Sequence, residues 1–121
     1  MNYDSCTTLA STARPGVSFI IRRMSLDRRA ELTRRLQELF RRIEFLEAGT
    51  DPREGIEAAL LTTEVERVYL LWGLVEVRGL EVDGQPATPE SLAAAGPEDV
   101  CREIVAAIKA ESGLAEDERK N

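Results

Sequence analysis

Arginine is the residue type in this sequence whose spacing points most directly to chemistry. Four Arg-Arg pairs recur every six or seven residues, starting at Arg22, Arg28, Arg34 and Arg41. On a helix, the last three pairs place guanidinium groups in two columns that flank a leucine stripe. Such groups bind phosphates or the carboxylates of an acidic partner. The alternative interpretation is a solvated helix flank that pairs with acidic residues of the next helix, notably Glu57, Glu64 and Glu66.

The residues that would support catalysis are largely missing. Histidine is absent from all 121 residues, which excludes Ser-His and Cys-His pairs and histidine-ligated metal sites. The acidic pairs Glu64/Glu66 and Glu98/Asp99 lack another carboxylate at a spacing that would complete an acid–base or cation site. Cys101 falls on an apolar helical stripe, where cysteine packs as a small hydrophobic residue. We therefore expect no enzyme activity, no cofactor and no metal.

The charge is distributed unevenly along the chain. Residues 14–42 contain nine arginines and three acidic residues, whereas residues 43–121 contain seven basic and eighteen acidic residues. The net charge of −6 therefore hides a basic segment followed by an acidic one. Such a chain can pair with itself as a homo-oligomer or with a complementary partner, and nucleic-acid binding would depend on the basic segment alone.

The sequence also bears on the compartment. Two cysteines in different contexts form no disulfide framework, which favours a reducing environment. The longest apolar run is far shorter than the roughly 18–20 residues needed to span a bilayer. Residues 1–13 lack the basic and apolar regions of a signal peptide. We expect a cytoplasmic protein without membrane contact.

The N-terminal half predicts a short strand and a helical hairpin. Residues 1–16 are rich in Ser, Thr, Ala and Gly, so a flexible N-terminal arm is expected. Residues 17–22 alternate in a β pattern. Residues 25–48 and 51–73 each begin with a capping residue and carry apolar side chains at spacings of three and four. The short connection between these two helices predicts an antiparallel pair.

The C-terminal half predicts a small β element and two further helices. Residues 74–83 change to a period of two and form one strand or two, interrupted at Gly79. Helices are expected over 88–95 and 97–112, each opened by proline. The predicted fold is thus mainly α with a minor β component (α+β). We expect one helical domain over residues 17–113 and a charged tail over residues 114–121.

The order of these parts, and several stretches within them, are similar to a known family. The stretches are the strand Val17–Ile21, the arginine-rich hairpin, Leu70–Leu74, Leu80–Glu90 and the close from Glu103–Ile108 to Arg119-Lys120-Asn121. Over residues 17–121 the chain resembles the small tail assembly chaperones of long-tailed phages and prophages. Residues 1–16 have no counterpart in that resemblance.

The resemblance implies a protein that acts in the host cytoplasm and is absent from the mature virion. Its partners would be the tape measure protein, which it keeps soluble, and the tail tube protein that polymerises around it. In such families a longer form made by ribosomal frameshifting often accompanies the short one. The resemblance carries no catalytic residues, in agreement with the missing histidines.

A chaperone for a long amphipathic client needs an apolar groove with a charged rim. Phe40 and Phe45 lie off the main apolar stripe of the first helix, so we expect that such a groove includes them. The hypothesis assigns the lining to Leu26, Phe40, Phe45 and Trp72. It assigns the rim to Arg28, Arg35 and Arg42.

Two other functions remain open from the sequence. A small arginine-rich nucleic-acid-binding regulator would use the basic helix, and its affinity would fall steeply with salt. A structural component of the tail or of the head–tail joint would remain in purified particles, where a chaperone would be absent.

Overall fold

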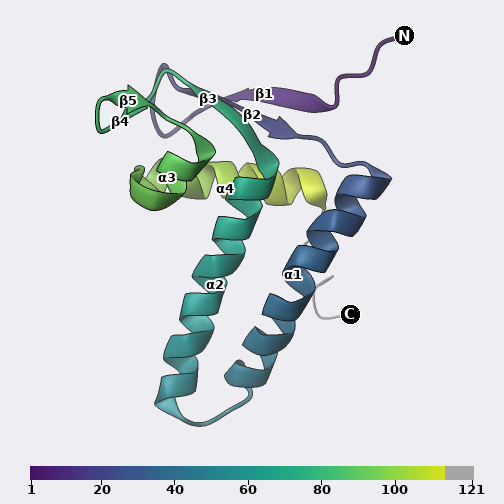
Figure 1. Cartoon of the computed structure of the whole chain (residues 1–121), viewed down its shortest axis with the longest axis vertical. Coiled ribbons are helices and arrows are strands. Elements are labelled where there is room, and N and C mark those ends of the chain that lie inside the picture. Colours follow the sequence, from purple (N-terminus) through teal and green to yellow (C-terminus); the bar gives the residue numbers. More distant parts are fainter. Residues whose placement is uncertain (114–121) are drawn as a thin grey trace.

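Two long antiparallel helices form the largest feature of the computed structural model, which describes residues 1–113 (Figure 1). Helix α1 spans Leu26–Glu47 and helix α2 spans Pro52–Gly73. The side chains of Ser25 and Asp51 each accept a hydrogen bond from a backbone N–H of the following first turn. Both helices therefore begin at the predicted caps, and the helical hairpin is confirmed.

The two helices pack through the apolar stripes expected from their spacing. Leu32, Leu36 and Ile43 are the buried residues of α1, and Ala58 and Val65 are buried on α2. Because residues three, four and seven apart share one helix face, each helix presents a continuous seam to its neighbour. The seam joins α1 to α2 along the hairpin.

A three-stranded antiparallel sheet lies at one end of this hairpin (Figure 1). Its strands are β1 (Cys6–Ala10), β2 (Ser18–Arg22) and β3 (Leu74–Arg78), in the order β1-β2-β3. Phe19 and Ile21 of the central strand point into the core, as the alternating pattern predicts. Because β3 follows α2 directly, the sheet is fixed to the end of the hairpin.

The prediction of a flexible arm over residues 1–16 is wrong for Cys6–Ala10, which forms strand β1. The strand pairs with β2 along its whole length. Beyond its end, the Glu103 carboxylate accepts hydrogen bonds from the hydroxyl groups of Ser11 and Thr12. These partners are remote in sequence, so the local composition of residues 1–16 gave no sign of them.

The remaining elements follow the hairpin. They are β4 (Glu81–Val82), β5 (Gln85–Pro86), α3 (Pro89–Ala95) and α4 (Glu98–Ser112). Both predicted C-terminal helices are confirmed, and the predicted β element becomes two strands in separate sheets. The chain turns between them at Gly79, where φ is +83° and a Cβ would lie 2.2 Å from the Gly16 oxygen. The predicted charged tail, residues 114–121, lies outside the described residues.

The core lies where α3, α4 and the three-stranded sheet meet the hairpin. Val100, Ile104 and Ile108 of α4 are completely or almost completely buried there. We call this end of the hairpin the body end, and the end closed by residues 48–51 the distal end. Figure 1 shows the distal end extending away from α3, α4 and the sheet. Within residues 1–113, no helix combines the length and apolar character needed to cross a bilayer.

Candidate partner-binding surface

The distal end of the hairpin exposes three large apolar side chains. Phe45 of α1 is 78% exposed, and Ile56 and Leu60 of α2 are 65% and 67% exposed. Ile56 and Leu60 lie four residues apart and therefore share one face of α2. That face is not the one that carries buried Ala58 and Val65. We call these three residues the distal apolar surface; they lie on the sides of α1 and α2 that point away from the seam between the two helices. Exposed apolar surface of this kind is a candidate for protein–protein contact.

Ion pairs at the distal end lie in solvent. Arg42 of α1 lies 3.7 Å from Glu57 of α2, and Arg53 lies 3.7 Å from Asp51. Each of these four side chains is at least 43% exposed. Such pairs contribute little to folding, because water screens them and the side chains lose conformational freedom. The exposed apolar side chains of the distal end are thus accompanied by ion pairs that contribute little to stability.

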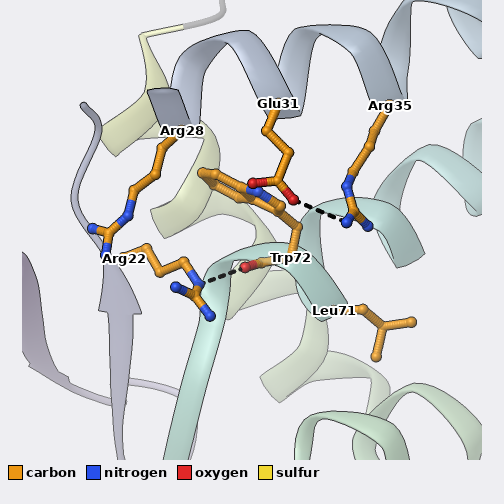
Figure 2. Close-up of a pocket in the computed structure, with 6 residues that line it drawn as sticks. All are labelled: Arg22, Arg28, Glu31, Arg35, Leu71 and Trp72. Carbon is orange, nitrogen blue, oxygen red and sulfur yellow. Dashed lines mark hydrogen bonds and ion pairs between the residues drawn. The ribbon is translucent and has the colours of Figure 1, made fainter. Parts of the chain in front are cut away.

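A small pocket lies at the body end (Figure 2). Six residues from β2, α1 and α2 line it: Arg22, Arg28, Glu31, Arg35, Leu71 and Trp72. We call it the arginine pocket. Figure 2 shows Arg22 and Arg28 on one side of the Trp72 indole and Arg35 on the other. Its volume of about 190 Å³ is below the range typical of drug-sized ligands, so it suits a side chain or a small anion.

The arginines of this pocket are also structural. Arg22 Nε donates a hydrogen bond of 3.0 Å to the Trp72 carbonyl, in the last turn of α2. Arg28 Nη1 donates to the carbonyl oxygens of Ser5 and Arg23. These bonds satisfy carbonyl groups at the end of α2, directly before β1, and in the connection between β2 and α1. They also fix the two guanidinium groups beside the pocket.

The lining of the pocket contains three guanidinium groups and one carboxylate. Glu31 Oε1 accepts a hydrogen bond of 2.9 Å from Arg35 Nη2. Neither Arg22 nor Arg28 forms an ion pair with any described residue. The pocket therefore carries a net positive charge, which favours a carboxylate or phosphate over a cation.

The structure does not bring the seven predicted partner-binding residues into one groove. Arg28, Arg35 and Trp72 meet in the arginine pocket, while Arg42 and Phe45 lie near the distal end. Nineteen residues of helix, about 28 Å at 1.5 Å per residue, separate Leu26 from Phe45.

The predicted apolar lining residues other than Phe45 differ in exposure. Leu26 is 89% exposed at the start of α1, at the body end. Phe40 is half-buried and packs against the core. Trp72 is almost fully buried, so only a small part of its indole is accessible to a partner. Of the predicted apolar lining, Phe45 alone belongs to the distal apolar surface.

Sequence reasoning missed Ile56 and Leu60. Both lie outside the stripe formed by Ala58, Leu61 and Val65, which faces α1. Their spacing of four residues is itself the signal of a second apolar stripe on the same helix. Ile56 and Leu60 remain exposed within residues 1–113, so this second stripe is free to contact a partner.

The predicted pairing of the α1 arginines with acidic residues of α2 occurs at one position. Arg42 pairs with Glu57 across the hairpin. Glu64 instead pairs with Arg67 of its own helix. Glu66 pairs with Arg102 of α4 at 3.3 Å. Most of the α1 arginines are therefore not neutralised by α2.

The described residues present no assembled reactive group. Burial raises the pKa of the Cys101 thiol, and the carboxylates of Glu98 and Asp99 raise it further. Its Sγ lies 3.4 Å from the Leu92 carbonyl and donates to it. The thiol is therefore protonated at neutral pH and is a poor nucleophile. Within residues 1–113, no three acidic or cysteine side chains are placed to hold a metal ion.

Comparison of this chain with protein-family models, with curated proteins and with solved structures found no match.

Proposed function

We propose that this protein is a non-catalytic chaperone that binds a helical protein client through the distal end of its hairpin. The observation that carries the proposal is the distal apolar surface, where Phe45, Ile56 and Leu60 are each about two-thirds exposed or more. These side chains belong to two well-formed helices, so their backbone is already ordered before a partner binds. A client gains free energy by covering such side chains with its own apolar surface.

The surroundings of these residues suit reversible binding. The exposed pair Arg42–Glu57 and the nearby Arg41 and Arg53 provide charges that can exchange between their own partners and those of a client. Apolar contact at the centre excludes water, while exposed charges at the edge add little affinity and set orientation. An escort protein needs such an interface, because it must release its client.

The resemblance to tail assembly chaperones supports a specific client, the tape measure protein of a long-tailed phage or prophage. That client is long and helical, and it must remain soluble until tail tube subunits enclose it. The proposal places this binding in the host cytoplasm and excludes the protein from the finished particle. A structural component of the tail would instead be found in purified particles.

The test is co-expression of the chain with a tape measure protein of a long-tailed phage. We expect the wild-type chain to keep the client soluble and to co-purify with it. The triple variant Phe45→Ser, Ile56→Ser, Leu60→Ser should leave the client insoluble. The control is Leu26→Ser, which removes an apolar side chain that is 89% exposed at the body end. If the triple variant and the control retain the client equally, the distal apolar surface is not the binding site.

The arginine pocket favours one second candidate, binding to nucleic acid. Its surplus of guanidinium groups could contact phosphates through Arg22 and Arg28. This function predicts an affinity for DNA or RNA that falls steeply with salt and is lost in Arg28→Ala. A gel-shift series across salt concentrations distinguishes it from the chaperone, whose client binding depends on apolar contact.

A further inference from the structure

The outer edge of strand β1 is open. The sheet order β1-β2-β3 places β1 at one edge, and within the described residues β1 pairs only with β2. An edge strand presents unpaired N–H and C=O groups that can template pairing with another strand. In Figure 1, β1 lies on the outside of the molecule, away from the hairpin.

The backbone hydrogen bonds at the two ends of β1 identify which backbone groups face outward. Ser11 N–H donates to the Val17 carbonyl, and the Ser5 carbonyl accepts from Arg23 N–H. In an antiparallel pair, the residues that bond to the neighbouring strand alternate with residues that point away. Odd-numbered residues of β1 therefore face β2. The N–H and C=O groups of Cys6, Thr8 and Ala10 point to the open edge.

The two edges of the sheet differ in the features that prevent pairing with another strand. Strand β3 carries Glu76 and Arg78, its pairing with β2 contains a bulge, and α3 packs beside it. Strand β1 reads Cys-Thr-Thr-Leu-Ala, with no charged residue and no proline, and its register with β2 is regular. Charges, prolines and bulges are the devices by which proteins prevent edge pairing. The β3 edge has two of them, and the β1 edge has none.

Strand β1 is also held firmly in place. Glu103 of α4 accepts hydrogen bonds from Ser11 and Thr12, and Asp99 forms an ion pair of 3.1 Å with Arg14. These contacts fix the chain just after β1 to the body of the protein. The open edge is therefore a rigid template that loses little conformational entropy on pairing.

We propose that β1 pairs in antiparallel fashion with β1 of a second copy of this chain, across a twofold axis at Thr8. Thr8 then lies opposite Thr8 of the second copy, and Cys6 lies opposite its Ala10. Each of these three pairs, 6 with 10, 8 with 8 and 10 with 6, exchanges two backbone hydrogen bonds. The two three-stranded sheets become one sheet of six strands.

A second copy suits this edge because the edge is self-complementary. Antiparallel pairing places Leu9, which is 37% exposed, opposite Thr7 of the second copy, so the pairing covers an apolar side chain. No like charges meet across the axis, since β1 carries none. An isologous interface of this kind closes on itself and yields a dimer instead of a fibre.

The test measures molar mass by light scattering on the purified full chain over a range of concentrations. We expect a wild-type mass of twice 13.4 kDa. Thr8→Pro should give the monomer mass, because proline removes an outward N–H and leaves the bonds to β2 intact. Thr8→Lys, which adds a charge to the edge, should weaken the dimer in the same direction. A monomeric wild type, or a dimer that persists in both variants with native circular dichroism, overturns the proposal.

Cross-linking provides a second, independent measurement. In a chain with Cys6→Ser and Cys101→Ala, Thr8→Cys should form a covalent dimer under mild oxidation. The expected Cα separation of about 5.5 Å for such a pair is within disulfide range. The matched control is Thr50→Cys, an exposed position in the turn of the hairpin. Equal cross-linking in both chains contradicts pairing at Thr8.

Discussion

The body end and the distal end of the same hairpin are built from the same two helices but differ in what surrounds them. At the body end, Tyr69, Leu70 and Trp72 are buried against α3, α4 and the sheet. At the distal end, no other element within residues 1–113 covers α1 and α2, and Ile56 and Leu60 remain exposed (Figure 1). The apolar residues of the body end stabilise the fold, and those of the distal end are available to a partner.

This difference shows how a small chain can separate folding from binding. The body end contributes most of the buried apolar surface, so the distal end can keep exposed side chains without unfolding the protein. Substitutions at the two ends should therefore affect different properties. Body-end changes should alter the free energy of unfolding, and distal-end changes should alter client binding.

The largest expected effect comes from truncating a buried leucine at the body end. Leu32 of α1 is fully buried, and Leu32→Ala should lower the free energy of unfolding by about 2–5 kcal/mol, because it removes buried methyl groups and leaves a cavity. The matched variant Leu60→Ala should change it by less than about 0.5 kcal/mol. Urea unfolding followed by circular dichroism measures both. Equal losses would show that the distal end is part of the core.

Two glycines of α2 give a second comparison. A Cβ at Gly73 would lie 2.7 Å from the Ile108 side chain, so Gly73→Ala should destabilise the fold by about 1–3 kcal/mol. A Cβ at Gly55 has no atom within 4 Å, so Gly55→Ala should stabilise the fold by up to about 1 kcal/mol. Thermal unfolding of both variants checks the opposite signs. A stabilising Gly73→Ala would contradict the tight packing of α2 on α4.

The carboxylate of Glu103 tests whether the N-terminal strand belongs to the body end. Burial raises the pKa of Glu103, but hydrogen bonds from Ser11, Thr12 and Ala13 outweigh it and give a lowered pKa. A carboxyl group with a lowered pKa in the folded state stabilises the fold above its unfolded pKa, and that contribution disappears as the pH falls through the folded value.

The free energy of unfolding should therefore decrease on acidification below the ordinary glutamate pKa of 4.5. Glu103→Gln should show a weaker decrease, which urea unfolding at neutral and acidic pH measures. The variant should also show faster hydrogen exchange in residues 6–12. An identical pH dependence in the variant and the wild type would mean that Glu103 does not hold the strand.

The smallest expected effect concerns the ion pair at the distal end. Arg42 and Glu57 lie 3.7 Å apart with about half of each side chain exposed, so their coupling free energy should be below about 0.5 kcal/mol. A double-mutant cycle with Arg42→Ala and Glu57→Ala measures it. A coupling well above 1 kcal/mol would show that charge, in addition to the apolar seam, holds the distal end together.

Local signals in the sequence predicted most of the fold. Caps at Ser25 and Asp51 and apolar residues at spacings of three and four suffice to define α1 and α2. Strand β1 was missed because its stability depends on β2 and on Glu103, which lies more than ninety residues away in the chain. The β-branched pair Thr7-Thr8 was its one local sign.

The candidate site was predicted only in part. Phe45 was identified because it lies off the α1 stripe, and it is exposed. Leu26 and Trp72 were assigned to the same groove as Phe45. Whether a side chain of α1 or α2 is exposed depends on whether α3, α4 or the sheet packs over it. The spacing of apolar residues within α1 and α2 carries no information about that packing.

Hydrogen–deuterium exchange on the complex with a tape measure protein locates the bound client on the hairpin. We expect client binding to slow exchange in residues 42–62, around Phe45, Ile56 and Leu60, and to leave the exchange of residues 69–78 unchanged. Slowed exchange at the body end alone, or no change at the distal end in a complex that does form, would contradict binding through the distal apolar surface.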